Sequence, residues 1–275
     1  MRPLTALRDR LERAQPGDRL RIDGGPRVSP AQRLVELLLP WLVRAIVVRD
    51  YRGQHHVPAR GPVIVASNHI SDADPFVLSD FLLGCGRHAH LLAKRVLFTV
   101  PGVGWFLRKA LMIPVRRGSA VAANALIDAT AALRAGAAVG IYPEGEESLD
   151  PTYWPMTGQP GVAALARETG APVIPVVVWG TQHIRGRTRS LHLLPRSHVS
   201  VWAGDPVDLS AWRDAPFTDQ VLKDMTDHVM AAVLELEERA RRQAPPAPVL
   251  GPRPGWRPDR AQARQGVVPA SDSEG

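Results

Sequence analysis

The sequence predicts an α/β fold in which a mixed β-sheet is flanked by helices. Short apolar runs typical of buried strands alternate with longer segments of helical periodicity, and nothing repeats at a fixed period. The 45% of hydrophobic residues in a chain of 275 is typical of a globular protein. Because α/β folds of about 200 to 250 residues commonly form one domain, we expect one domain with terminal segments.

The predicted strands are apolar runs too short to be helices, whereas the predicted helices carry apolar residues at spacings of three and four. The last helix, for example, has Leu222, Met225 and Val229 on one side and acidic residues on the other. The predicted strands span residues 63–66, 91–93, 112–115, 139–142, 173–178, 191–194 and 199–202, and the predicted helices span residues 75–83, 119–135, 161–169 and 218–242.

The chain begins with a basic segment that ends in its most apolar stretch. Residues 1–33 are rich in Arg and lack the apolar region and the cleavage site of a signal peptide. Residues 34–48 are mostly apolar, but a helix needs about 20 apolar residues to cross a bilayer. Their spacing fits either a helix lying in a membrane interface or an ordinary core helix. We define residues 1–60 as a basic N-terminal segment containing this amphipathic helix.

The two remaining parts of the chain differ in composition. Residues 61–243 contain the alternating pattern and form the predicted folded domain. Residues 244–275 are rich in Pro, Arg and Ser and cannot bury enough apolar surface to fold, so we expect a disordered tail.

Cysteine content and charge exclude several classes of function. The single Cys85 excludes an internal disulfide and a multi-cysteine metal site. Cys85 could be a nucleophile, but its place at the end of a predicted helix favours a small buried residue. The net charge of +7 favours anionic partners. Because the sequence contains no nucleic-acid-binding motif, we expect an anionic membrane surface rather than nucleic acid.

Polar residues concentrate where the strand over residues 63–66 ends. His69 lies in the loop that follows this strand, and Asp74 precedes Pro75, which suits the first turn of a helix. Asp74 is predicted to cap that helix, and capping alone would explain its presence. Because α/β folds place their sites at the carboxyl ends of strands, His69 and Asp74 are also candidates for a catalytic pair.

Four sequence blocks resemble those of the glycerolipid acyltransferases, especially the 1-acyl-glycerol-3-phosphate acyltransferases. The resemblance covers roughly residues 61–209, and the blocks follow one another in the family's order. The first block is the His-x4-Asp motif of His69 and Asp74. The other three blocks are the stretch from Ala93 to Gly118, the turn Tyr142-Pro143-Glu144-Gly145, and residues 170–176.

The resemblance implies transfer of an acyl group from a thioester, acyl-CoA or acyl carrier protein, to a lysolipid hydroxyl, without a metal or other cofactor. His69 would accept the proton of that hydroxyl, and Asp74 would bind the other ring nitrogen. Ser67 and Ser71 leave a covalent route open as an alternative. The residues implied for substrate binding are Lys94, Arg116 and Arg117, as cations for a phosphate, and Tyr142, Pro143, Glu144 and Gly145, as the acceptor-site turn, in which Glu144 would anchor the loop or contact acceptor hydroxyls.

The resemblance also bears on location. Family members carry membrane-associating helices before the His-x4-Asp motif, which favours the interfacial interpretation of residues 34–48. We therefore expect a peripheral protein on the cytoplasmic face of the cell membrane. The alternatives are a weakly active or inactive family member that binds acyl donors or membranes, and a basic nucleic-acid binder.

The sequence departs from the family in the third block. Relatives usually continue Glu-Gly-Thr-Arg-Ser, whereas this chain has Glu146 and Glu147 in place of the Thr and the Arg. Like charges at a few ångströms cost on the order of 1 kcal/mol even when partly screened, so the acceptor's identity stays open. The later cationic residues His183, Arg185, Arg187 and Arg189 could restore positive charge to the site or form a solvated loop.

Overall fold

The computed structural model describes residues 30–94, 99, 113–115, 119–186 and 190–242. Its centre is one seven-stranded sheet of order β1-β7-β6-β2-β5-β3-β4. All neighbouring strands are parallel except β6 and β7, which are antiparallel. The strands are β1 (Val47–Arg52), β2 (Val63–Ser67), β3 (Ala89–Lys94), β4 (Ile113–Val115), β5 (Ala138–Ile141), β6 (Val173–Trp179) and β7 (Ser197–Ala203).

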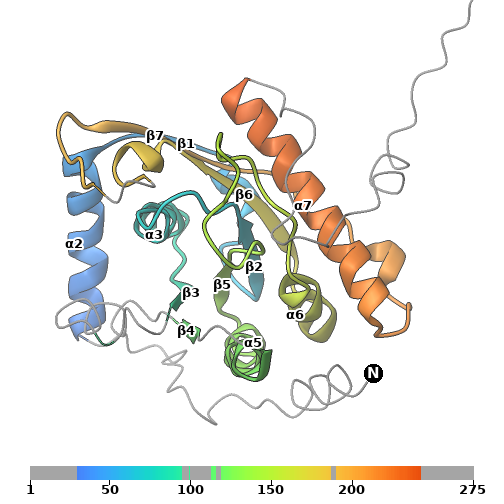
Figure 1. The fold of residues 1–275 in the computed structure, drawn as a ribbon. Coiled ribbons are helices and arrows are strands. Elements are labelled where there is room, and N and C mark those ends of the chain that lie inside the picture. The colour runs from blue at the N-terminus through green and yellow to red at the C-terminus, as the bar shows by residue number, and fades with distance from the viewer. Residues whose placement is uncertain (1–29, 95–98, 100–112, 116–118, 187–189, 243–275) are drawn as a thin grey trace, which may run out of the picture.

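Helices cover both faces of the sheet (Figure 1). α2 and α3 pack on one face, and α5, α6 and α7 pack on the other. The α-helices are α2 (Pro30–Ile46), α3 (Asp74–Gly84), α5 (Ser119–Arg134), α6 (Gly161–Thr169) and α7 (Asp219–Arg241), and the 3-10 turns are η1 (Gln54–His56), η3 (Thr181–His183) and η4 (Ser210–Trp212).

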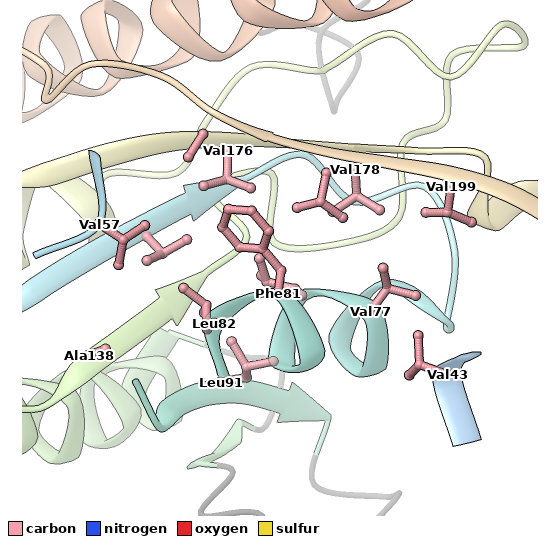
Figure 2. Close-up of a cluster of buried hydrophobic side chains, with 14 of the residues drawn as sticks. Val43, Val57, Val77, Phe81, Leu82, Leu91, Ala138, Val176, Val178 and Val199 are labelled. Carbon is pink, nitrogen blue, oxygen red and sulfur yellow. The ribbon is translucent and has the colours of Figure 1, made fainter. Parts of the chain in front are cut away.

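The continuous apolar run of β2 is explained by burial on both faces. Val63 and Val65 contribute to the core under α3, whereas Ile64 and Ala66 contribute to the core under α5, α6 and α7. Figure 2 shows the first of these cores, in which Phe81 of α3 points toward the sheet. A strand between two helical layers needs apolar side chains at every position, because successive residues face opposite layers.

The predicted mixed sheet with flanking helices is confirmed, but two elements were predicted wrongly. The predicted helix over residues 34–48 ends at Ile46, and residues 47–52, expected in the N-terminal segment, form edge strand β1 instead. Its polar, half-buried side chains gave no strand pattern. Residues 191–194 form no strand of the sheet; they lie in a loop where Leu191 makes an isolated bridge to Arg185. The predicted disordered tail, residues 244–275, lies outside the described residues.

Parallel pairing brings the ends of three strands to one edge of the sheet. β2 pairs in parallel with both β5 and β6, so the loops after Ser67, Ile141 and Trp179 are neighbours. These three loops contain the first block, the third block and the residues after the fourth block. The carboxyl edge of the sheet is therefore where the sequence blocks meet.

At the opposite edge, Arg87 ties three loops together. Its guanidinium donates to the carbonyl oxygens of Pro58, Gly61 and Gly136, at 3.0, 2.7 and 3.1 Å. Because a charged donor typically contributes ~1.5 to 3 kcal/mol, Arg87→Met should lower the free energy of unfolding by about 2 kcal/mol or more. Arg134→Met, which removes a partly exposed ion pair, should cost under about 1 kcal/mol. Urea denaturation checks both values, and equal midpoints for the two variants would contradict this role of Arg87.

Candidate active site

His69 and Asp74 meet in the loop between β2 and α3. The Nδ1 atom of His69 lies 2.9 Å from the Oδ2 atom of Asp74. Asp74 is fully buried, and the side chain of His69 is 10% exposed. A buried carboxylate that binds one nitrogen of a histidine fixes the orientation of the ring and stabilises its protonated form.

Asp74 is held by more donors than His69 alone. The backbone N–H groups of Ile70 and Ser71 donate to its Oδ2 atom at 2.7 and 2.9 Å, and the hydroxyl of Thr181 donates to Oδ1. The predicted helix cap is wrong: Ala73 occupies the N-cap position, and Asp74 is the first helical residue. The carboxylate thus serves the loop and the histidine rather than the helix terminus, and its hydrogen bonds compensate for its burial.

Thr181 is a site residue that the sequence analysis did not identify. It begins η3, directly after Gly180 at the end of β6. Gly180 has a φ of 107°, and a Cβ atom there would lie 2.1 Å from the carbonyl oxygen of His198 in β7. Only glycine therefore allows the turn that brings the Thr181 hydroxyl to Asp74. The sequence signal that could have identified Thr181 is a Gly-Thr pair directly after an apolar strand.

The ring of His69 stacks on Tyr142, which follows β5. The two ring centroids are 4.3 Å apart, and the planes differ by 21°. Burial, reinforced by the negative charge of Asp74, raises the pKa of Tyr142 well above its usual value, so the phenol stays neutral. With Nδ1 bound to Asp74, Nε2 is the nitrogen that can accept a proton, and no hydrogen bond to it occurs within the described part of the chain.

The nearby nucleophiles are engaged elsewhere. The hydroxyl of Ser67 donates to the carbonyl of Asn68, and the hydroxyl of Ser71 donates to the carbonyl of Arg185. Neither serine hydroxyl donates to His69, so the geometry does not favour the covalent alternative. Burial raises the pKa of Cys85 to about 11, which keeps the thiol protonated and unreactive.

Glu144 anchors the third sequence block to the histidine loop. It is 2% exposed, and its two carboxyl oxygens accept from the backbone N–H groups of His69 and Met156, at 3.0 and 2.9 Å. The backbone N–H of Ser148 donates in turn to the carbonyl of His69 at 2.7 Å. Burial raises the pKa of Glu144 well above its usual value. Of the two roles expected for Glu144, the structure shows the anchor.

The other residues of the third block surround this anchor. Pro143 is buried, and its carbonyl accepts from the backbone N–H of Gln159. Gly145 is exposed and has a φ of 76°, a value that favours glycine. Glu146 and Glu147 are both half-exposed on the same turn.

The second sequence block is described only in part. Lys94 is the last residue of β3, where its backbone pairs with Val115 of β4. Arg116 and Arg117 lie outside the described residues. No described cluster of His, Cys, Asp and Glu residues is arranged to hold a metal ion.

Asn68 joins the histidine loop to β6 and α7. Its side-chain amide donates to the carbonyl of Val178 at 3.0 Å and accepts from the N–H of Val178 at 2.8 Å, as a peptide group would in a sheet. This side chain extends the β2–β6 pairing while the backbone turns away toward His69. The amide also donates to Glu237, whose pKa burial raises to about 8, and Glu237 pairs with Arg241.

The chain is similar in sequence to known acyltransferases. A family model described as Acyltransferase matches residues 48–179. The chain is 28% identical over 160 residues to a chloroplastic 1-acyl-sn-glycerol-3-phosphate acyltransferase of Brassica napus, covering 58% of this chain and 44% of the relative. It is 30% identical over 132 residues to the 1-acyl-sn-glycerol-3-phosphate acyltransferase of Borreliella burgdorferi, covering 48% and 51%. The chain therefore spans about half the length of these curated relatives.

A solved structure shares the fold. The crystal structure of the 1-acyl-sn-glycerophosphate acyltransferase from Thermotoga maritima superposes with a TM-score of 0.53 and 24% sequence identity. The match covers 75% of this chain and 78% of that one. At 24% identity, the similarity shows that this chain and the Thermotoga maritima protein share a fold.

The Asn68 bridge predicts a positioning effect. Asn68→Ala should remove the bridge to Val178 and let His69 shift, and a displacement of about 1 Å costs on the order of 100-fold in rate. Asn68→Asp should be at least as severe, because it places a carboxylate beside Glu237. The loss should appear in kcat, with KM nearly unchanged, in steady-state kinetics. Gln220→Ala, which removes an exposed amide on α7, is the control. An Asn68→Ala enzyme with the wild-type kcat would refute the positioning role.

Proposed function

The chain belongs to the glycerolipid acyltransferase family through residues 48–179, and on that premise we propose that it is an O-acyltransferase. It moves a fatty acyl group from a thioester donor, acyl-CoA or acyl carrier protein, to a hydroxyl of a lysophospholipid, either 1-acyl-glycerol-3-phosphate or a related lysolipid. The observation that carries this proposal is the buried contact between Asp74 and Nδ1 of His69, which leaves Nε2 for the acceptor.

The reaction needs no protein nucleophile. His69 Nε2 takes the proton of the acceptor hydroxyl as its oxygen attacks the thioester carbonyl. Asp74 accepts a hydrogen bond from the Nδ1–H of the imidazolium that forms. The new C–O ester bond forms, the C–S bond breaks, and the imidazolium returns its proton to the leaving sulfur. The enzyme therefore ends the cycle unchanged.

The acceptor site of this chain carries acidic rather than basic residues in its third block. Glu146 and Glu147 lie on the turn that Glu144 and Ser148 fasten to His69. A phosphomonoester carries more than one negative charge near neutral pH, so it meets more repulsion there than a zwitterionic or neutral headgroup. We infer that an acceptor other than 1-acyl-glycerol-3-phosphate competes well.

We also propose a peripheral location on the cytoplasmic face of the membrane, and the exposed face of α2 supports the membrane contact in this proposal. Val35, Leu39 and Val43 pack into the core, as an ordinary core helix requires. The opposite face exposes large apolar side chains, including Leu37 at 63% and Trp41 at 64%. Such a face suits the membrane interface, with the tryptophan at the level of the headgroups. Among the described helices, none has the length and apolarity needed to span a bilayer.

The alternative is a family member of weak or absent activity that binds acyl donors or membranes. The intact contacts of His69 and Asp74 favour an active enzyme over this alternative. Incubating the purified chain with labelled acyl-CoA and a panel of lysolipids separates the two. Labelled diacyl product supports the enzyme, and donor binding without product would leave only the alternative.

The acidic pair predicts a change of acceptor preference. Glu147→Arg should raise the ratio of kcat/KM for 1-acyl-glycerol-3-phosphate over a zwitterionic lysolipid by on the order of tenfold, because it replaces repulsion by attraction. Added salt should shrink the shift, since the turn is partly exposed. Asp214→Arg makes the same charge change at an exposed position beyond the opposite edge of the sheet and should leave the ratio unchanged. A wild type that strongly prefers 1-acyl-glycerol-3-phosphate, with a ratio insensitive to Glu147→Arg, would contradict this inference.

A further inference from the structure

Exposed large apolar side chains of the described residues are confined to three places. Five are on α2, one is Leu149, and three are Leu191, Leu193 and Leu194. The last three are 60%, 41% and 80% exposed. Scattered exposed leucines need no explanation, but leucines gathered on two loops beside a candidate site indicate a contact surface.

Both loops are fastened to the His-x4-Asp loop. Leu149 directly follows Ser148, whose N–H donates to the carbonyl of His69 at 2.7 Å. The other loop is held by Ser71, whose hydroxyl donates to the carbonyl of Arg185 at 2.7 Å. Arg185 in turn bridges to Leu191. Hydrogen bonds to Ser148 and Arg185 therefore tie both leucine-bearing loops to the backbone of the His-x4-Asp loop.

The segment that includes β6, β7 and the loop between them carries cationic but no acidic side chains. Residues 171–203 contain four Arg and three His and no Asp or Glu. Arg196 and His192 are exposed beside the leucines, and the guanidinium of Arg185 lies 3.5 Å from Asp72. Exposed leucines interleaved with cations match an anionic lipid surface, which offers acyl chains to the former and negative charge to the latter.

We propose that Leu149, Leu191, Leu193, Leu194 and Arg196, here called the entrance surface, dock onto an anionic lipid bilayer. This inference rests on the proposed acyltransferase function and assigns a membrane contact to loop residues in addition to α2. Docking places the entrance to His69 at the interface, so that a lysolipid acceptor reaches Nε2 by lateral diffusion with its acyl chain still among lipids. It also explains why residues 191–194 are apolar without forming a strand of the sheet.

The test uses the full chain and sedimentation with vesicles of phosphatidylcholine alone or mixed with phosphatidylglycerol. Replacing Leu191, Leu193 and Leu194 by Ser should weaken partitioning into the mixed vesicles by ~10-fold or more, because three side chains lose their insertion into the interface. Arg196→Glu should weaken binding to the mixed vesicles only. Arg213→Glu, an exposed arginine beyond the opposite edge of the sheet, should bind like the wild type.

A second measurement separates docking from chemistry. Transfer between a short-chain acyl-CoA and a short-chain lysolipid below its critical micelle concentration needs no bilayer, so the triple Ser variant should lose far less of this activity than of its activity on vesicles. Wild-type partitioning by the triple variant would overturn the proposal. If the triple Ser variant loses a concentration-dependent self-association of the wild type but still binds vesicles, the leucines contact a second copy of the chain. That result would also overturn the proposal. If neither the wild type nor the triple Ser variant transfers acyl groups in solution, the proposed acyltransferase function is wrong. The vesicle partitioning of the two proteins still tests the docking surface in that case.

Discussion

The hydrogen bond between the buried carboxylate of Asp74 and the ring of His69 is the constraint on which the surrounding structure depends. A carboxylate without solvent contact needs donors, and here they come from two loops: the backbone of residues 70–71 and the hydroxyl of Thr181. Supplying Thr181 requires the glycine turn after β6. The parallel pairing of β2 with β6 places that turn beside the histidine loop.

Two other buried carboxyls, Glu144 and Glu237, lie near this contact. Burial is the main cause of the raised pKa of both Glu144 and Glu237, and the charge of Asp74 adds to it. Both residues serve as acceptors for backbone or amide N–H groups of the histidine loop, so a neutral carboxyl can still perform the task. The charge of Asp74 therefore lies against the ring of His69, and it favours the protonated form of that ring.

Much of the fold and part of the site could be predicted from the sequence. The apolar run of β2 and the adjacent His69 and Asp74 are local signals, and short separation in sequence makes their contact predictable. Thr181 and Glu237 could not be found in this way, because they come from positions more than a hundred residues away and meet the loop only through sheet pairing. The leucines of residues 191–194 resembled a strand because apolarity alone does not distinguish a buried strand from an exposed loop.

Single-turnover transfer tests whether His69 itself acts as the base. The purified protein, at a concentration above that of a labelled acyl-CoA, is mixed with saturating lysolipid, and wild type is compared with His69→Ala after circular dichroism shows that both are folded. The variant should retain under about 1% of the wild-type rate, because general bases typically contribute ~100-fold to 10,000-fold. No labelled acyl-enzyme should accumulate in the wild type. A variant that retains a tenth of the rate would show that His69 is not the base, and a covalent acyl-protein intermediate would show that the acyl group passes through a protein nucleophile.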